Sequence, residues 1–351
     1  MKKLISLLLV LAMALTLVAC GGKTEAPAET QAAAPEAAAP EAPAAEVTTY
    51  DVGVAIYQYN DNFMTLYRQE IEAYFKTLET DTVKYNITMV DSKNDMAEQT
   101  NQIDTFITQG MDVIILNLVQ TSSAEVLIDK IVAADIPLVL INREPLGETD
   151  ESYPGIINNA SVCYVGADAR QSGTYQGEIV LALEDKGDVN GNGKVDYVMI
   201  IGDPENPDAQ YRTEFSIKAL TDAGVEVNCL VSNVGNWDQT KGQEIAAAAL
   251  AQFGDEIDVI FCNNDGMALG AAAAIEAAGR VVGEDIYLLG VDALDECQEM
   301  VQAGTMTGTV LNDHIGQSHT AVDVAVKALN GEAIDNYYWV DYLKVDAAYF
   351  G

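Results

Sequence analysis

The chain has 351 residues, enough for two domains, and 49% of them are hydrophobic, which is sufficient to build a core. Its 54 acidic and 18 basic residues give a formal net charge of −36. This charge repels nucleic acid and anionic membrane surfaces, so neither is an expected partner. The only two histidines, His314 and His319, leave little material for a histidine-built zinc site or a histidine-based catalytic relay.

The first twenty residues resemble the signal peptide of bacterial lipoproteins. A positive start, Met1–Lys3, precedes an apolar stretch, Leu4–Val18, that is short for a membrane span, and the cleavage site ends in Cys20. The resemblance implies that residues 1–19 are removed and that acylated Cys20 anchors the mature protein to the cell membrane, outside the cytoplasm. The alternative is an ordinary cleavage site beside a coincidental cysteine. Residues 20–47, mostly Ala, Pro, Glu and Thr, predict a disordered acidic tether.

Short apolar runs then alternate with amphipathic stretches. The first half contains four predicted strands, at Val52–Tyr57, Ile87–Val90, Val113–Leu118 and Leu138–Ile141. The second half contains four more, at Tyr197–Ile201, Val225–Leu230, Val259–Cys262 and Tyr287–Leu289. Continuous apolar strands separated by helices are typical of parallel sheets covered on both faces. Two such sets predict an α/β fold of two doubly wound parallel-sheet lobes.

Between the two sets, the segment 188–196 has the spacing of a calcium-binding loop. Such a loop takes side-chain oxygens at alternate positions, here Asp188, Asn190, Asn192 and Asp196. It also needs a glycine for a sharp turn and a backbone carbonyl, supplied by Gly193 and Lys194. The closing glutamate of a helix-loop-helix site is replaced by Met199, inside an apolar run that predicts a buried strand. A further carboxylate must therefore come from elsewhere, unless the segment is an ordinary polar turn.

Polar and aromatic residues follow the predicted strands. They include Asp61, Phe63, Asn117, Asn142, Arg143, Asp208, Arg212, Trp237, Asn264 and Asp292. Carboxylates, amides and guanidinium groups pair with sugar hydroxyls, and aromatic faces cover the C–H surface of a pyranose. Taken singly, each Asp or Asn is more commonly a helix N-cap, and each aromatic residue more commonly belongs to the core. Because ligands bind beyond the carboxyl ends of such strands, their joint occurrence favours a cleft for an uncharged polyhydroxylated molecule.

Nine segments together resemble the galactose/glucose-binding branch of the type I periplasmic-binding-protein family, whose members serve sugar ABC importers. They are Ile56–Met64, Asp91–Ser92, Ile115–Leu118, Asn142–Pro145, Tyr164–Gly166, Asn206–Arg212, Asn263–Asp265, Gly290–Leu294 and Gly308–Asp313. The resemblance runs in the same order from about residue 50 to about residue 315 and weakens near the C-terminus. It implies a monomeric, extracytoplasmic binding protein for D-galactose and D-glucose.

The resemblance also implies site residues. Phe63 and Trp237 would sandwich the sugar ring, and its hydroxyls would bond to Asp61, Asn142, Asp208, Arg212, Asn264, Asp292 and Asn312. Asn206 stands where the family has a histidine; its amide can still donate to the 6-hydroxyl, so the preferred sugar and the affinity stay open. Asp258 would supply the missing ligand of a structural Ca²⁺ site.

The same resemblance implies a three-segment hinge, near residues 166–168, 312–314 and 343–345. The N-terminal lobe would contain residues 48–166 plus 313–343, and the C-terminal lobe residues 167–312 plus 344–351. Ligand would close the lobes, and the closed form would dock on an ABC permease in the membrane. A chemoreceptor or a membrane histidine kinase could read the same closed form, so a sensing role is the alternative to transport, and another monosaccharide is the alternative ligand.

Other functional classes lack their signals. The chain has no recognisable nucleophile–base pair and no glycine-rich phosphate loop, so an enzyme is not expected. A sugar-responsive repressor would need a basic helix-turn-helix in place of the signal peptide and acidic tether. Four cysteines, Cys163, Cys229, Cys262 and Cys297, show no paired spacing; three of them are expected in the core, and one disulfide is left open.

Overall fold

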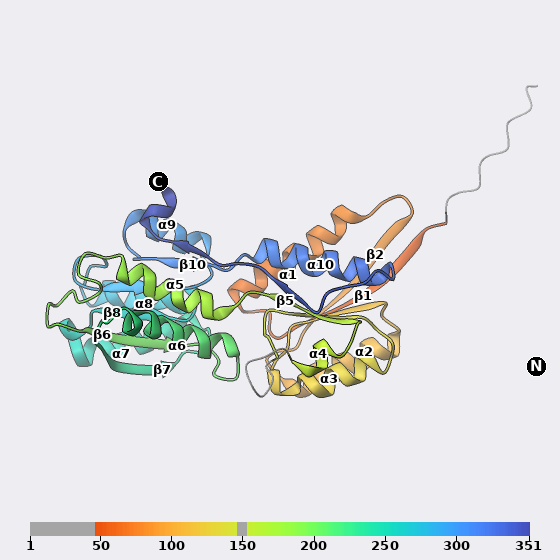
Figure 1. The fold of residues 1–351 in the computed structure, drawn as a ribbon, viewed down its shortest axis with the longest axis horizontal. Helices are drawn as coiled ribbons and strands as arrows, with labels where there is room; N and C mark the ends of the chain where they lie inside the picture. Colours follow the sequence, from red (N-terminus) through yellow and green to blue (C-terminus); the bar gives the residue numbers. More distant parts are fainter. Residues whose placement is uncertain (1–45, 146–152) are drawn as a thin grey trace, which may run out of the picture. The chain divides into compact units, whose positions relative to one another are not determined.

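A computed structural model describes residues 46–145 and 153–351 (Figure 1). The predicted signal peptide, the lipidation site at Cys20 and nearly all of the tether lie outside the described residues. Within these two ranges, no helix combines the length and the apolar character that crossing a membrane requires.

The first lobe is built on a six-stranded parallel sheet with the strand order β11-β5-β4-β3-β1-β2. Its strands are β1 (Thr48–Ile56), β2 (Val83–Asp91), β3 (Val113–Leu116), β4 (Leu138–Ile141), β5 (Val162–Gly166) and β11 (Tyr337–Trp339). Strands β3, β4 and β5 are buried along their whole length. This burial on both faces explains why they consist of continuous apolar runs.

Helices cover both faces of this sheet (Figure 1). One face carries α1 (Asn62–Leu78) and α10 (His314–Leu329), which pack against each other. The other carries α2 (Met96–Gln109), α3 (Ala124–Val132) with the short 3₁₀ helix η1 (Thr121–Ser123), and α4 (Pro154–Ile157). Because α10 follows most of the second lobe in sequence, the first lobe is completed only when the chain returns to it.

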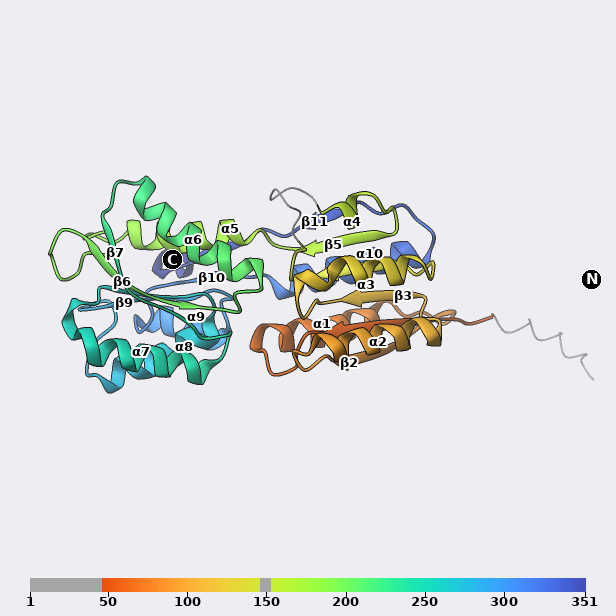
Figure 2. The same ribbon diagram turned by 90° about the horizontal axis from the view of Figure 1, so that it is seen from below.

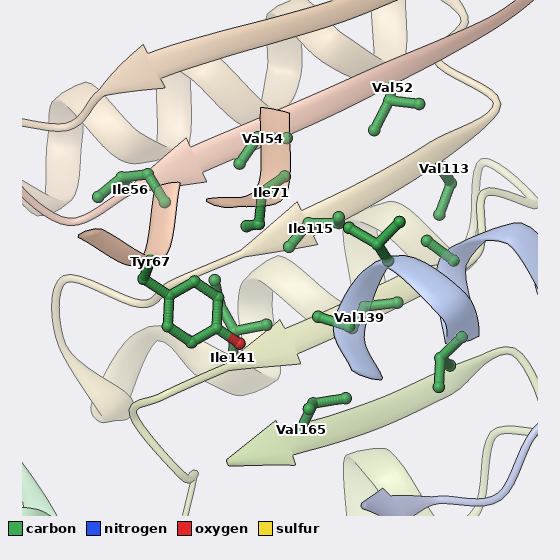
Figure 3. Close-up of a cluster of buried hydrophobic side chains, with 14 of the residues drawn as sticks. Val52, Val54, Ile56, Tyr67, Ile71, Val113, Ile115, Val139, Ile141 and Val165 are labelled. Carbon is green, nitrogen blue, oxygen red and sulfur yellow. The ribbon is translucent and has the colours of Figure 1, made fainter. Parts of the chain in front are cut away.

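The core beneath α1 and α10 shows how the strand pattern becomes packing (Figure 3). Alternate residues of β1, such as Val54 and Ile56, point to this face, where Tyr67 and Ile71 of α1 meet them. All four side chains are fully buried. Val54 and its neighbours therefore hold α1 against this face of the sheet.

The second lobe has a four-stranded parallel sheet with the order β7-β6-β8-β9. Its strands are β6 (Val195–Ile201), β7 (Val227–Val234), β8 (Val259–Cys262) and β9 (Tyr287–Leu289). Figure 2 shows α5 (Ala169–Leu181) and α6 (Pro207–Asp222) on one face and α7 (Gln239–Phe253) and α8 (Asp265–Ala277) on the other. The remaining helices are η2 (Gly254–Glu256), α9 (Asp295–Ala303) and η3 (Ala347–Phe350).

The chain passes between the two sheets three times. It leaves β5 for α5, returns from β10 (Thr309–Leu311) to α10, and leaves β11 for β12 (Leu343–Val345). Strand β12 pairs antiparallel with β10, with Leu343 opposite Leu311. Leu343, expected in the first lobe, therefore already pairs within the second, and the last passage spans residues 340–342.

The predicted α/β fold with two parallel-sheet lobes is confirmed. Strands β4, β8 and β9 have the predicted bounds, and Met199 lies in strand β6 as expected. Among the described residues all four cysteines are free thiols; Cys163, Cys262 and Cys297 are buried, whereas Cys229 is exposed on β7.

Candidate functional site

A pocket lies beyond the carboxyl ends of the strands and is lined by both lobes. All ten residues that the sequence pointed to as sugar contacts line this pocket, namely Asp61, Phe63, Asn142, Asn206, Asp208, Arg212, Trp237, Asn264, Asp292 and Asn312. Tyr57, Met64 and Arg143 complete the lining. Residues from distant parts of the chain are thus brought to one place.

Three of these residues also cap helices. Asp61 Oδ1 accepts the backbone N–H of Met64 at 2.7 Å and begins α1. Asn206 and Asn264 cap α6 and α8 in the same way, at 3.0 and 2.9 Å. Capping occupies the oxygen of Asn206 and leaves its Nδ2 as a donor. It also brings the positive ends of three helix dipoles to the pocket, where they favour the partial negative charge of ligand oxygens.

Arg212 is the centre of the polar wall. Its buried guanidinium donates from Nη2 to Asp208 Oδ2 at 3.2 Å and to the Tyr342 hydroxyl at 3.0 Å, and from Nη1 to the Asn263 carbonyl at 2.9 Å. Asp292 Oδ1 lies 4.0 Å from Nη1. Burial raises the pKa of both Asp208 and Asp292, against the opposite effect of Arg212. Asp208 and Asp292 share one guanidinium, so hydroxyl groups of a ligand that donate to these buried carboxylates would stabilise their charged form.

A second arginine, Arg143, joins the lobes at the edge of the pocket. Its side chain is 1% exposed, its guanidinium lies 3.8 Å from the centre of the Tyr57 ring, and its Nη1 lies 3.1 Å from Asp203 Oδ2 of the other lobe. The Tyr57 hydroxyl donates to Asp61 Oδ2 at 2.6 Å. The sequence analysis noted Arg143 at a strand end but assigned no role to it. Tyr57 was not identified as a pocket residue, because it lies at the end of an apolar run.

Residues behind the pocket fix the orientation of its amides. Asn117 Nδ2 donates to Asn142 Oδ1 at 3.2 Å, which leaves Asn142 Nδ2 as the free donor. Asn312 Oδ1 accepts from Gln317 at 2.6 Å, while its Nδ2 donates to Asp292 Oδ1 at 3.2 Å. The strand-end residue Asn117 is therefore a support for the pocket and not part of its lining.

Comparison with known proteins identifies the family of this two-lobed chain. The model of the periplasmic binding protein domain family matches residues 52–333, well over half of the chain. The chain belongs to the periplasmic-binding-protein family. Membership implies an extracytoplasmic location.

Relatives of this binding protein are themselves solute-binding proteins, which agrees with the expectation that it is not an enzyme. The D-galactose/methyl-galactoside binding periplasmic protein MglB of Haemophilus influenzae is 34% identical over 287 residues, 80% of this chain and 82% of that protein. A putative rhizopine-binding protein of Rhizobium meliloti is 32% identical and covers 85% and 90%. A solved ABC transporter solute binding protein of Bacillus halodurans, with bound myo-inositol, is 27% identical with a TM-score of 0.73 and covers 85% and 95%.

The predicted calcium loop of the binding protein is folded around its acidic side chains. Asp188 accepts the backbone N–H groups of Asn192 and Gly193 at 3.0 and 2.9 Å. Asp258, the residue before β8, accepts those of Asn190 and Asp196 at 2.9 and 2.8 Å. Asp258 therefore meets the loop from a distant part of the chain, where the sequence resemblance implied it.

The donor set of this loop is of the hard oxygen type that Ca²⁺ requires. Burial raises the pKa of Asp258 to about 6, and the charges of Asp188 and Asp196 add to this effect. Lys194, expected to contribute only its carbonyl, places its ammonium 2.8 Å from Asp196 Oδ1. Over residues 46–145 and 153–351, no group of three or more His, Cys, Asp or Glu side chains converges as metal ligands do. Calcium binding at this loop stays a prediction.

Proposed function

We propose that this binding protein captures a neutral monosaccharide, D-galactose or D-glucose, and delivers it to an ABC import permease. The observation that carries the proposal is the composition of the pocket. It joins two aromatic side chains, Phe63 and Trp237, with three carboxylates and oriented amide donors from both lobes. Sugars need this mixture, because each hydroxyl both donates and accepts while the C–H face of the ring is apolar.

The relatives support this class of ligand. Galactose, in the name of the Haemophilus protein, and myo-inositol, bound in the Bacillus structure, both present a six-membered ring that carries several hydroxyl groups. A sensing role would use the same pocket. The genes beside this one, for a permease and an ATPase or for a histidine kinase, distinguish the two roles.

Calorimetry with a panel of ligands tests the proposal. D-Glucose and D-galactose are expected to bind tightly, and D-ribose and myo-inositol serve as competing classes. Trp237→Ala should weaken hexose binding by about 2–4 kcal/mol, because the substitution removes the large aromatic surface that contacts the sugar ring. Trp339→Ala is the matched control, since the other tryptophan of the chain is 48% exposed and lies outside the pocket. Failure of every aldohexose to bind would end the proposal.

We further propose that the protein is held at the membrane through lipid-modified Cys20. The supporting pattern is an apolar segment that ends in a small-residue cleavage site followed by cysteine. Cys20→Ser should move the protein from the membrane fraction to the soluble extracytoplasmic fraction. Unchanged membrane retention of this variant would contradict the anchor.

A further inference from the structure

Both histidines of the chain lie in helix α10, and His314 is its first residue. The helix begins just after the pocket residue Asn312, with Asp313 as its N-cap. His314 is partly buried and is not among the residues that line the sugar pocket. It is therefore a titratable side chain directly beside the pocket, with no contact of its own to a ligand there.

The imidazole of His314 packs against Phe63, one of the two aromatic residues proposed to cover the sugar ring. The two ring centres lie 6.5 Å apart, and the rings are nearly perpendicular, at 87°. Tyr67 of α1 also packs against Phe63, with 5.9 Å between the ring centres. Neither His314 nor Tyr67 lines the pocket. Two aromatic side chains from different helices thus hold the Phe63 ring from outside the pocket.

A charged imidazole is poorly accommodated beside Phe63. A cation is attracted to an aromatic face within about 6 Å of the ring centre, and the 6.5 Å between these two rings exceeds this distance. Burial lowers the pKa of the His314 imidazole below its usual value. A sugar ring stacked on Phe63 would exclude more water from this region. The neutral form of His314 is therefore favoured further in the sugar-bound protein.

Three carboxylates face His314 and oppose the effect of burial on its pKa. They belong to Asp313 on its own helix end, Glu70 of α1 and Asp295 at the start of α9. Glu70 already pairs with the other histidine, since His319 Nε2 lies 2.7 Å from Glu70 Oε1. Within residues 46–145 and 153–351, this is the only ion pair that a histidine makes. No carboxylate of the described chain thus neutralises a charge on His314 at contact distance.

We propose that His314 is a positioning residue for Phe63, and that the protein binds its sugar more tightly when this imidazole is neutral than when it is protonated. The inference rests on the proposed function, because the sugar ring must stack on Phe63. The sugar-bound protein then holds fewer protons than the free protein. Affinity is therefore constant above the pKa of His314 and falls as the pH drops through it.

Calorimetry on the full protein with D-galactose and D-glucose tests the proposal between about pH 5.5 and 7.5, where histidine titrates. His314→Phe keeps an aromatic packing partner and removes the titratable group. Its hexose affinity at neutral pH should stay within about twofold of the wild type. Towards acid pH the wild type should lose about threefold more affinity than this variant, which corresponds to a pKa difference of about half a unit between free and bound protein.

His319→Gln is the matched control, because it removes the other histidine of the same helix and should keep the histidine-dependent fall in affinity. The pocket carboxylates Asp208 and Asp292, whose pKa values burial raises, also take up protons at acid pH. The difference between wild type and His314→Phe therefore measures the histidine, because both proteins retain these carboxylates. Melting curves establish that each variant is folded.

Proton counting gives a readout that a purely structural role would not change. Calorimetry in two buffers of different ionisation enthalpy measures the protons that are released when hexose binds. The wild type should release more protons near the pKa of His314 than His314→Phe does. If His314→Phe does not fold, the wild type alone decides, since an absence of proton release across the same pH range would overturn the proposal.

The outcomes separate this proposal from the proposed function. Tight hexose binding with the same pH profile in wild type and His314→Phe would overturn the role of His314 and leave sugar binding intact. Loss of the histidine-dependent fall in His319→Gln, with its retention in His314→Phe, would also overturn it. If no aldohexose binds at any pH, both proposals fall.

Discussion

Backbone strain is concentrated at the pocket. Asn142, Trp237 and Asp292 have φ angles of 63°, 65° and 121°, where non-glycine residues are uncommon. Each such residue costs on the order of 1–3 kcal/mol and persists only where its surroundings enforce it. Gly202 lies next to Trp237 in space, and an added Cβ at this position would overlap the indole ring of Trp237. The glycine therefore leaves room for the ring. The direction of the indole is therefore set before any ligand arrives.

Some pocket residues could be predicted from the sequence, and others could not. It identified ten of the pocket residues, because polar side chains after apolar strands stand out in a pattern. Tyr57 did not stand out, since an aromatic residue at the end of an apolar run reads as core. The contact between Arg212 and Tyr342 joins residues 130 positions apart, and no local pattern reveals it. The orientation of amides such as Asn142 depends on neighbours behind the pocket and is likewise invisible in sequence.

At the scale of elements, the residues that flank a strand decide what could be predicted. An asparagine directly follows the apolar runs of β4 and β8, and a glycine follows β9, so the bounds of these strands follow from the sequence. Strands β10, β11 and β12 have only three residues each, and their pairing depends on segments far away in the chain. Their positions became clear only from the sheet order.

The calcium loop gives a prediction about one element. An ion that binds only the folded loop stabilises the folded state by mass action, by about 2.7 kcal/mol at a hundredfold excess over the dissociation constant. Chelator should therefore lower the melting temperature of the native protein, and added Ca²⁺ should restore it. Asp258→Asn should remove this response, because it takes away the carboxylate that closes the loop from β8.

Magnesium at equal concentration serves as the control, since its smaller ion requires a stricter geometry than this loop supplies. Identical melting curves with chelator and with Ca²⁺ would show that the Asp188–Asp196 segment is a polar turn. In that case the contact between Lys194 and Asp196 would be the charge compensation that the loop uses.

At the scale of the whole molecule, the two lobes depend on each other through the order of the chain. Helix α10 and strand β11 belong to the first sheet but follow the second lobe, and β12 then returns to pair with β10. Three short passages are the only covalent connections between the lobes in the described chain from residue 153 onward. Three parallel connections favour a bending motion about one hinge, which the sequence resemblance also implied.

The pair between Arg143 and Asp203 gives the final prediction, which concerns closure of the cleft. Asp203 does not line the sugar pocket, yet it holds a buried guanidinium of the opposite lobe at 3.1 Å. Asp203→Ala would leave that charge unpaired in the closed form, so hexose affinity should fall about tenfold without loss of any direct ligand contact. Asp222→Ala, which breaks an exposed pair within α6, is the matched control. Calorimetry measures the affinity, and small-angle scattering with saturating hexose measures closure. Equal affinity and equal compaction of both variants would exclude a role of this pair in closing the cleft.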